Sequence, residues 1–205
     1  MDRIALNSRL NSLTDEELLA VASGTPCSPQ SVAIVTEAIA IQFLDEIQVY
    51  AETEYWARRL KSVSLLSDHD VDELLAKHGN VFARGLLGTA AEDDKLTETQ
   101  LSRIANEETE DRYITRPVRA RSLVNQINEQ LESGADGETI VALFAQLYET
   151  GLAWPVRELA ERLPVELLDP LDQLALKYKF TRVYRHEVRA AFATARKKAR
   201  QSGKS

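Results

Sequence analysis

Cysteine is almost absent from this chain of 205 residues. The single cysteine, Cys27, excludes an internal disulfide and an all-cysteine metal site. It lies in "GTPCSPQ", between turn-forming residues, which predicts an exposed loop thiol. A catalytic cysteine needs a neighbouring base, and no pattern around Cys27 supplies one, so we expect no nucleophile there.

Long apolar runs are also missing. The most apolar tract, "SVAIVTEAIAIQFL", is interrupted by Glu37 and Gln42 and is shorter than the ~20 residues needed to cross a bilayer. The opening "MDRIALNSRL" has an acid at position 2 and no apolar centre, unlike a secretory signal. These absences predict a cytoplasmic protein without membrane contact.

Glycine and proline are scarce, with 8 and 6 residues respectively, and no stretch has the composition of a flexible linker. At 44% apolar residues, the chain can bury one sizeable core, or two small helical subdomains that share a contact. We therefore expect most of the chain to be ordered.

Apolar residues recur at helical spacing through most of the sequence. Between residues 29 and 61 the steps are mostly three and four, which predicts one long central helix with Ser28 as its N-cap and Pro29 at its first position. Further helices are expected over 80–91, from Pro117 to Gly134, from Asp136 to Gly151, between Pro155 and Pro164, after Pro170, and over 182–201. The pattern predicts an all-α protein of about eight or nine helices, either a multi-helix bundle or a short, irregular stack of helical hairpins.

Three segments share a helix-start pattern: "LTDEEL" at 13–18, "LSDHDV" at 66–71 and "LTETQL" at 96–101. In each, Thr or Ser can accept from the amide three residues on, while the Glu, Asp or Gln there reaches back to the cap amide. His69 between Asp68 and Asp70 resembles a metal or acid–base site. The repeat favours capping instead, because the other two copies have Glu16 and Thr99 at the histidine position. We expect no metal and no cofactor.

Charge is divided unevenly along the chain. Residues 177–205 contain ten Lys and Arg against one acid, whereas residues 1–176 contain 15 basic and 31 acidic side chains. Such segregation concerns partners or self-docking rather than the fold. We expect an acidic helical body over 1–176, with possible subdomains 1–92 and 93–176, and a basic C-terminal helix and tail over 177–205.

The basic segment is the candidate binding surface. Its arginines repeat on one face of the expected helix, beside an apolar stripe. The residues expected to contact nucleic acid or an acidic partner are Lys177, Lys179, Arg182, Arg185, Arg189, Arg196, Lys197 and Arg200. Three aromatic residues among them could stack on exposed bases: Tyr178, Phe180 and Tyr184. Alternatively, the helix docks on the acidic body and the aromatics join the core; residues 177–184 also fit an extended strand.

No catalytic constellation is recognisable, so we expect no enzyme. The leading hypothesis is an all-α interaction protein, a component or regulator of a larger assembly, whose basic helix contacts nucleic acid or an acidic partner. The alternative is a protein-binding adaptor or oligomerising subunit that uses the 29–61 helix and makes no nucleic-acid contact. In that alternative, Tyr50, Tyr55 and Trp56 are the candidate anchors, unless they complete the core.

Overall fold

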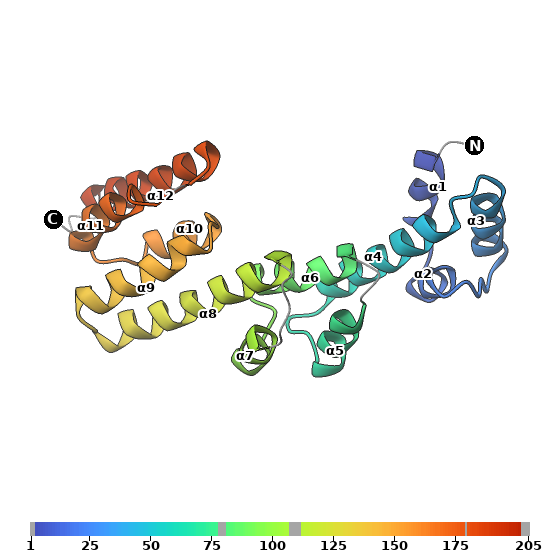
Figure 1. The fold of residues 1–205 in the computed structure, drawn as a ribbon, viewed down its shortest axis with the longest axis horizontal. Coiled ribbons are helices and arrows are strands. Elements are labelled where there is room, and N and C mark those ends of the chain that lie inside the picture. The colour runs from blue at the N-terminus through green and yellow to red at the C-terminus, as the bar shows by residue number, and fades with distance from the viewer. Residues whose placement is uncertain (1–2, 78–80, 107–111, 179, 202–205) are drawn as a thin grey trace. The chain divides into compact units, whose positions relative to one another are not determined.

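Helices make up all the regular secondary structure in the part of the chain that the computed structural model describes, residues 3–77, 81–106, 112–178 and 180–201 (Figure 1). This confirms the predicted all-α class. Twelve helices are found in these ranges, more than the eight or nine expected. Within the same ranges, no helix is both long and apolar enough to cross a membrane.

The chain forms two compact units, Met1–Ala90 and Ala91–Ser205. The helices of the first unit are α1 (Arg3–Leu10), α2 (Asp15–Ala22), α3 (Pro29–Ala40), α4 (Leu44–Ser62) and α5 (Asp68–Ala76), and α6 (Val81–Glu92) runs across the boundary. Part of its core lies among α1 to α4, where Leu6, Leu18, Ile34 and Ile47 are fully buried. Burying these apolar side chains is the main force that holds the short helices together.

The predicted long helix from 29 to 61 is wrong. It is two helices, α3 and α4, separated at Gln42, whose φ of 53° is left-handed. The amide of Phe43 donates to Ala38 O (2.8 Å), and that of Gln42 donates to Ile39 O (3.1 Å). This is a Schellman end, in which two otherwise unpaired carbonyls of the last turn gain donors. The buried Phe43 then starts the next helix in a new direction.

The second unit contains the other six helices found in the described ranges. They are α7 (Glu98–Asn106), α8 (Arg112–Ser133), α9 (Gly137–Glu149), α10 (Trp154–Ala160), α11 (Val165–Ala175) and α12 (Arg182–Gln201). One apolar core joins α8 to α12, and its largest fully buried side chains are Phe144, Tyr148 and Phe192. The predicted last helix matches α12, and no strand forms over the described part of 177–184.

Two prolines lie inside helices instead of limiting them. Pro117 is in the sixth position of α8 and Pro170 in the sixth of α11, so both expected helix starts are wrong. An internal proline costs about 3 kcal/mol through its lost amide and steric clash. In α11, burial of Leu167, Leu168 and Leu171 against the core offsets that cost. Asn80, the expected cap of α6, lies outside the described residues.

The three predicted helix starts are confirmed. Thr14 with Glu17 and Ser67 with Asp70 form reciprocal capping boxes at α2 and α5. At α7 the Thr97 amide donates to Gln100 Oε1 (2.9 Å) and the Gln100 amide donates to Thr97 Oγ1 (3.3 Å). Ser28 caps α3 before Pro29, and Asp136 caps α9 by accepting from the Thr139 amide. Each cap satisfies amides that have no partner within the helix.

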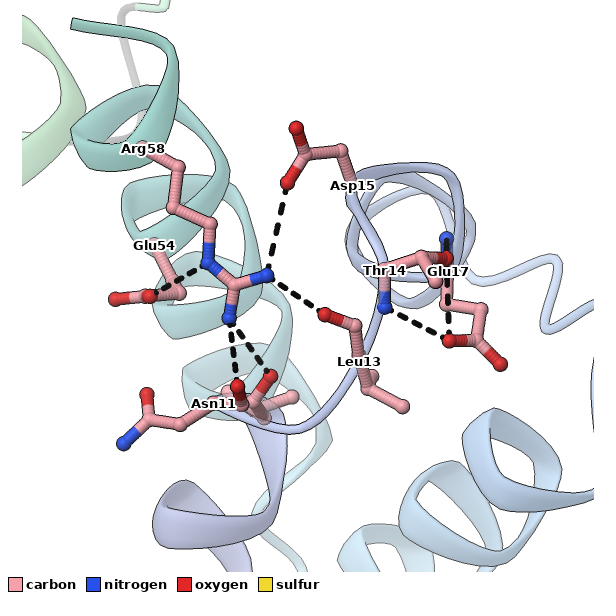
Figure 2. A network of polar contacts seen from close by, with 8 residues as sticks. Asn11, Leu13, Thr14, Asp15, Glu17, Glu54 and Arg58 are labelled. Atoms are coloured by element: carbon pink, nitrogen blue, oxygen red, sulfur yellow. Dashed lines mark hydrogen bonds and ion pairs between the residues drawn. The ribbon is translucent and has the colours of Figure 1, made fainter. Parts of the chain in front are cut away.

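Arg58 of α4 organises the turn between α1 and α2. Its guanidinium donates to the carbonyl oxygens of Leu13 (2.6 Å), Asn11 (3.0 Å) and Leu10 (3.4 Å), at the end of α1 (Figure 2). Glu54 holds Arg58 Nε from one turn earlier at 2.8 Å. A cation at a helix C-terminus meets both unpaired carbonyls and the negative end of the helix dipole.

In the second unit, Arg121 of α8 has a similar role but is buried, with 3% of its surface exposed. It donates through Nε to Ala91 O (2.7 Å) and through Nη2 to Glu92 O, the last residues of α6. Nη1 donates to Glu158 of α10 (2.8 Å), and the guanidinium lies over the Trp154 ring at 4.6 Å. The buried charge is therefore fully partnered, as such a charge must be.

Candidate functional site

Two faces of α12 have different surroundings. Tyr184, Val188, Phe192 and Ala195, spaced by four, four and three residues, are buried in the core of the second unit. This apolar stripe fixes the rotation of the helix and leaves the adjoining face toward solvent. Arg182, Arg185 and Arg189 are on that adjoining face and are exposed.

A groove of about 740 Å³ runs beside these arginines. Its charged lining consists of Arg182, Arg185, Arg189 and Arg196, together with His186, all from α12, and one acid, Asp172 of α11. Phe180, from the connection between α11 and α12, contributes an aromatic wall. Because α11 and α12 pack side by side (Figure 1), the groove lies along their junction and is strongly basic.

Two basic residues in the C-terminal half of α12, Arg196 and Lys198, form ion pairs within the second unit. Arg196 Nη2 lies 2.5 Å from Asp172 Oδ2, and its Nη1 lies 2.9 Å from Asp169 Oδ1. Lys198 Nζ pairs with Glu161, just after α10, at 2.5 Å. Part of the basic helix thus docks on acids of its own unit, one of the alternatives that the sequence left open.

The N-terminal half of α12 is different. Arg182, Arg185 and Arg189 have no ion-pair partner within the described ranges. Their spacing of three and four residues places them along about 10 Å of one helix face. Exposed guanidinium groups without an ion-pair partner are chemically able to bind an anion.

The other predicted basic residues are less well placed. Lys177, Lys197 and Arg200 are exposed, but none lines the groove. Lys179 lies outside the described residues. The structure therefore brings four of the predicted arginines together and leaves Lys177, Lys197 and Arg200 outside the groove.

The predicted stacking residues are part of an aromatic cluster. Tyr184 is 7% exposed, and its ring centroid lies 4.2 Å from that of Phe180. Tyr178 and Phe180 are half-buried and nearly parallel, at 12° with centroids 5.8 Å apart. Tyr148 of α9 contacts both of these rings edge-on, at 5.5 and 5.7 Å. Tyr184 is thus mainly a core residue, whereas Tyr178 and Phe180 reach the surface.

Burial controls the chemistry of the two most enclosed tyrosines. Desolvation raises the pKa of Tyr148 and of Tyr184 well above the ordinary tyrosine value, so both hydroxyls stay protonated. Tyr148 donates to Leu171 O (2.9 Å). The Tyr184 hydroxyl is buried without a hydrogen-bond partner within the described ranges.

The acidic cluster around His69 has no gathered ligand set. The His69 side chain is 87% exposed, and it lies 4.0 Å from Glu73. Asp70 is turned away toward Ser67 and Arg59, with which it forms hydrogen bonds. No three His, Cys, Asp or Glu residues in the described part of the chain are arranged to hold a metal ion. Cys27 is exposed.

The aromatic residues of α4 divide between core and surface. Trp56 is 2% exposed and packs edge-on against Tyr55, whose ring centroid is 5.3 Å away. Tyr50 is 40% exposed. Of the three candidate anchors, Tyr50 is the most exposed, and the buried Trp56 contributes to the core instead.

Sequence reasoning missed two features of this region. Asp172 was not recognised as a groove residue, although its spacing of three from Asp169 places both on one face of α11, where a single arginine can reach them. The second feature is a cavity beside the groove, lined by aromatic residues of α9, of α12 and of the segment before α12, and by Arg116 of α8. Its residues are 30 positions apart, and no local pattern could connect Tyr148 to Tyr178.

Comparison of the chain with protein-family models, with curated proteins and with solved structures finds no match.

Proposed function

We propose that this protein is a non-enzymatic, all-α interaction protein that binds nucleic acid through the basic groove of α12. The observation that carries the proposal is the row of Arg182, Arg185 and Arg189, which line one groove and have no ion-pair partner in the described chain. Arginine binds phosphate through a planar fork of donors and suits repeated anionic groups.

Nucleic acid fits this groove better than an acidic protein segment does. Its charges repeat regularly along the backbone, as the arginines repeat along one face of α12. Phe180 and Tyr178 lie at the groove and beside it, where aromatic rings can contact bases. The acidic remainder of the chain repels a polyanion, which confines contact to this basic surface.

Salt-dependent binding of a labelled oligonucleotide tests the proposal. Replacing Arg182, Arg185 and Arg189 together with Gln removes three expected phosphate contacts and leaves the buried stripe of α12 intact. The affinity should fall at all salt concentrations, and the slope of log K against log salt should decrease by about 2. Fluorescence anisotropy between 50 and 200 mM salt covers the useful range.

A matched control removes the same charge elsewhere. Lys61, Arg157 and Arg162 are exposed and line neither the groove nor the neighbouring cavity, so their joint replacement with Gln should leave the slope nearly unchanged. Equal losses of affinity in both triple variants would mean that net charge alone, and not the groove, determines binding. Absence of binding at low salt would refute the nucleic-acid proposal.

A second candidate function is self-association through α3. Val32 and Ile39, seven residues apart on one helix face, are 46% and 57% exposed, so an apolar strip faces solvent. A second copy could bury this strip. Sedimentation equilibrium of the native chain and of Val32→Lys with Ile39→Lys tests it: a strict monomer in both excludes this function.

A further inference from the structure

A second cavity, of about 370 Å³, adjoins the basic groove, and Phe180 lines both. Three more aromatic residues line it, Tyr148, Tyr178 and Tyr184. We propose that this cavity is a nucleobase pocket, and that the protein therefore binds single-stranded nucleic acid with one base inserted beside the phosphates held by α12. The inference rests on the proposed function and specifies its ligand.

The aromatic rings are arranged for a flat guest. Tyr178 and Phe180 stack nearly parallel, and Tyr148 meets each edge-on, at 61° and 73°. Tyr178 is half-buried, so part of its ring remains open to solvent. Stacking on such a platform suits any base, since every base has a π-face.

The polar groups of the cavity carry both charges and can form hydrogen bonds with a base. Glu149 lines it, with 55% of its side chain exposed, and its carboxylate can accept from the amino group of a base. The exposed Arg116 of α8 lines it too, and its guanidinium can donate to a base carbonyl. Tyr184 also lines the cavity, and its buried hydroxyl has no hydrogen-bond partner among the residues that the structure describes. The phosphates are attracted mainly to Arg182, Arg185 and Arg189, which line the groove across Phe180 and have no ion-pair partner among the described residues.

A base can enter this cavity only when it is unpaired and unstacked. In a duplex, that requires breaking a pair and flipping the nucleotide out, whereas a single strand has bases free to turn. The arrangement of groove and pocket therefore predicts preference for a single strand over a duplex of the same sequence.

Three oligonucleotides of equal length test the inference: a single strand, its duplex, and an abasic strand with the same phosphates. DNA and RNA versions are measured by fluorescence anisotropy on the full chain. We expect the single strand to bind about tenfold more tightly than the abasic strand, the effect of one stacked base. The duplex should bind more weakly than the single strand, and a mononucleotide should compete poorly.

Tyr178→Leu tests the pocket without removing charge. It should weaken binding of the single strand about tenfold but leave binding of the abasic strand unchanged, because only the former has a base to stack. A loss of folding would weaken both equally, and melting followed by circular dichroism checks it. Tyr50→Leu, at another partly exposed tyrosine in the first unit, is the control and should alter neither affinity.

The outcomes separate the pocket from the groove. Equal affinity for the single, abasic and duplex forms, lost in the triple arginine variant, refutes the pocket and leaves the proposed function standing. Equal weakening by Tyr178→Leu on the single and abasic strands also refutes it, as does a mononucleotide that binds as tightly as the strand. No binding of any form refutes both proposals.

Discussion

Arg196 Nη2 of α12 lies 2.5 Å from Asp172 Oδ2 of α11, and both residues line the basic groove. The pair joins the two helices, and the carboxylate also cancels positive charge where a phosphate would bind. We therefore expect Asp172→Asn to change affinity and stability in opposite directions. Affinity for an oligonucleotide at low salt should rise about fivefold, as expected for removing one nearby like charge. The free energy of unfolding should fall by about 1 kcal/mol.

Asp169→Asn is the matched control for that prediction. Asp169 also pairs with Arg196, at 2.9 Å, but its side chain is 82% exposed and does not line the groove. Solvent screens such a pair, so both effects should be smaller than for Asp172→Asn. Urea denaturation and anisotropy titrations measure the two quantities. Unchanged affinity in Asp172→Asn would contradict the assignment of the groove as the anion site.

Arg58→Met should destabilise the first unit. The substitution keeps most of the apolar stem but removes the donors to the Leu10, Asn11 and Leu13 carbonyls (Figure 2). Hydrogen bonds from a charged donor contribute about 1.5–3 kcal/mol, so we expect a loss of about 2 kcal/mol in urea denaturation. Glu54→Gln, which removes only the charge of the i,i+4 partner, should cost less than about 0.5 kcal/mol. Comparable losses of unfolding free energy in both variants would show that the Arg58–Glu54 ion pair, and not the hydrogen bonds to the carbonyls, provides the stabilisation.

Asp70 gives the stability a defined pH dependence. Burial alone would raise the pKa of this carboxyl, but hydrogen bonds from Ser67 and from Arg59 outweigh burial and lower the pKa below its ordinary 3.8. A lowered pKa in the folded state means that the stabilisation is complete above the unfolded value and is lost as pH falls through the folded one. Asp70→Asn should therefore be less stable than the native chain at pH 7, and the difference should shrink only below about pH 4. Urea denaturation at pH 7, 5 and 3 measures it; a constant difference would contradict the mechanism.

We expect His69 to make no contribution to metal-ion binding. It is exposed, and its contact with Glu73 is long, at 4.0 Å. A site with fewer than three converging ligands holds zinc weakly. Thermal denaturation with excess zinc or manganese should shift the melting temperature of the native chain and of His69→Ala by the same amount. A stabilisation lost in His69→Ala would overturn the capping interpretation of this segment.

The parts of the fold that the sequence predicts are those set by neighbouring residues. Capping at Thr14, Ser67 and Thr97 depends on side chains three positions apart, and α12 is defined by a regular apolar stripe. Pro170 was misjudged, because its local cost is offset by leucine burial that only the folded core supplies. The groove was partly predicted, as its arginines share one helix. Asp172 and the pocket around Tyr148 were not, since they come from other helices.

The break between α3 and α4 at Gln42 was also not evident from the helical spacing of the neighbouring apolar residues. The end of α2 has the same two Schellman bonds, Thr25 to Ala20 O (2.8 Å) and Gly24 to Val21 O (3.1 Å), with glycine at a φ of 74°. At the end of α3, Gln42 takes that position at 53°, where a side chain is strained by about 1 kcal/mol. Gln42→Gly should therefore stabilise the first unit by about 1 kcal/mol, and Gly24→Ala should destabilise it by at least as much. Urea denaturation of both variants tests the pair. If Gln42→Gly were destabilising instead, residue 42 would not adopt a left-handed conformation. The single helix over 29–61 predicted from the sequence would then be correct, and the two-helix arrangement of 29–62 would be wrong.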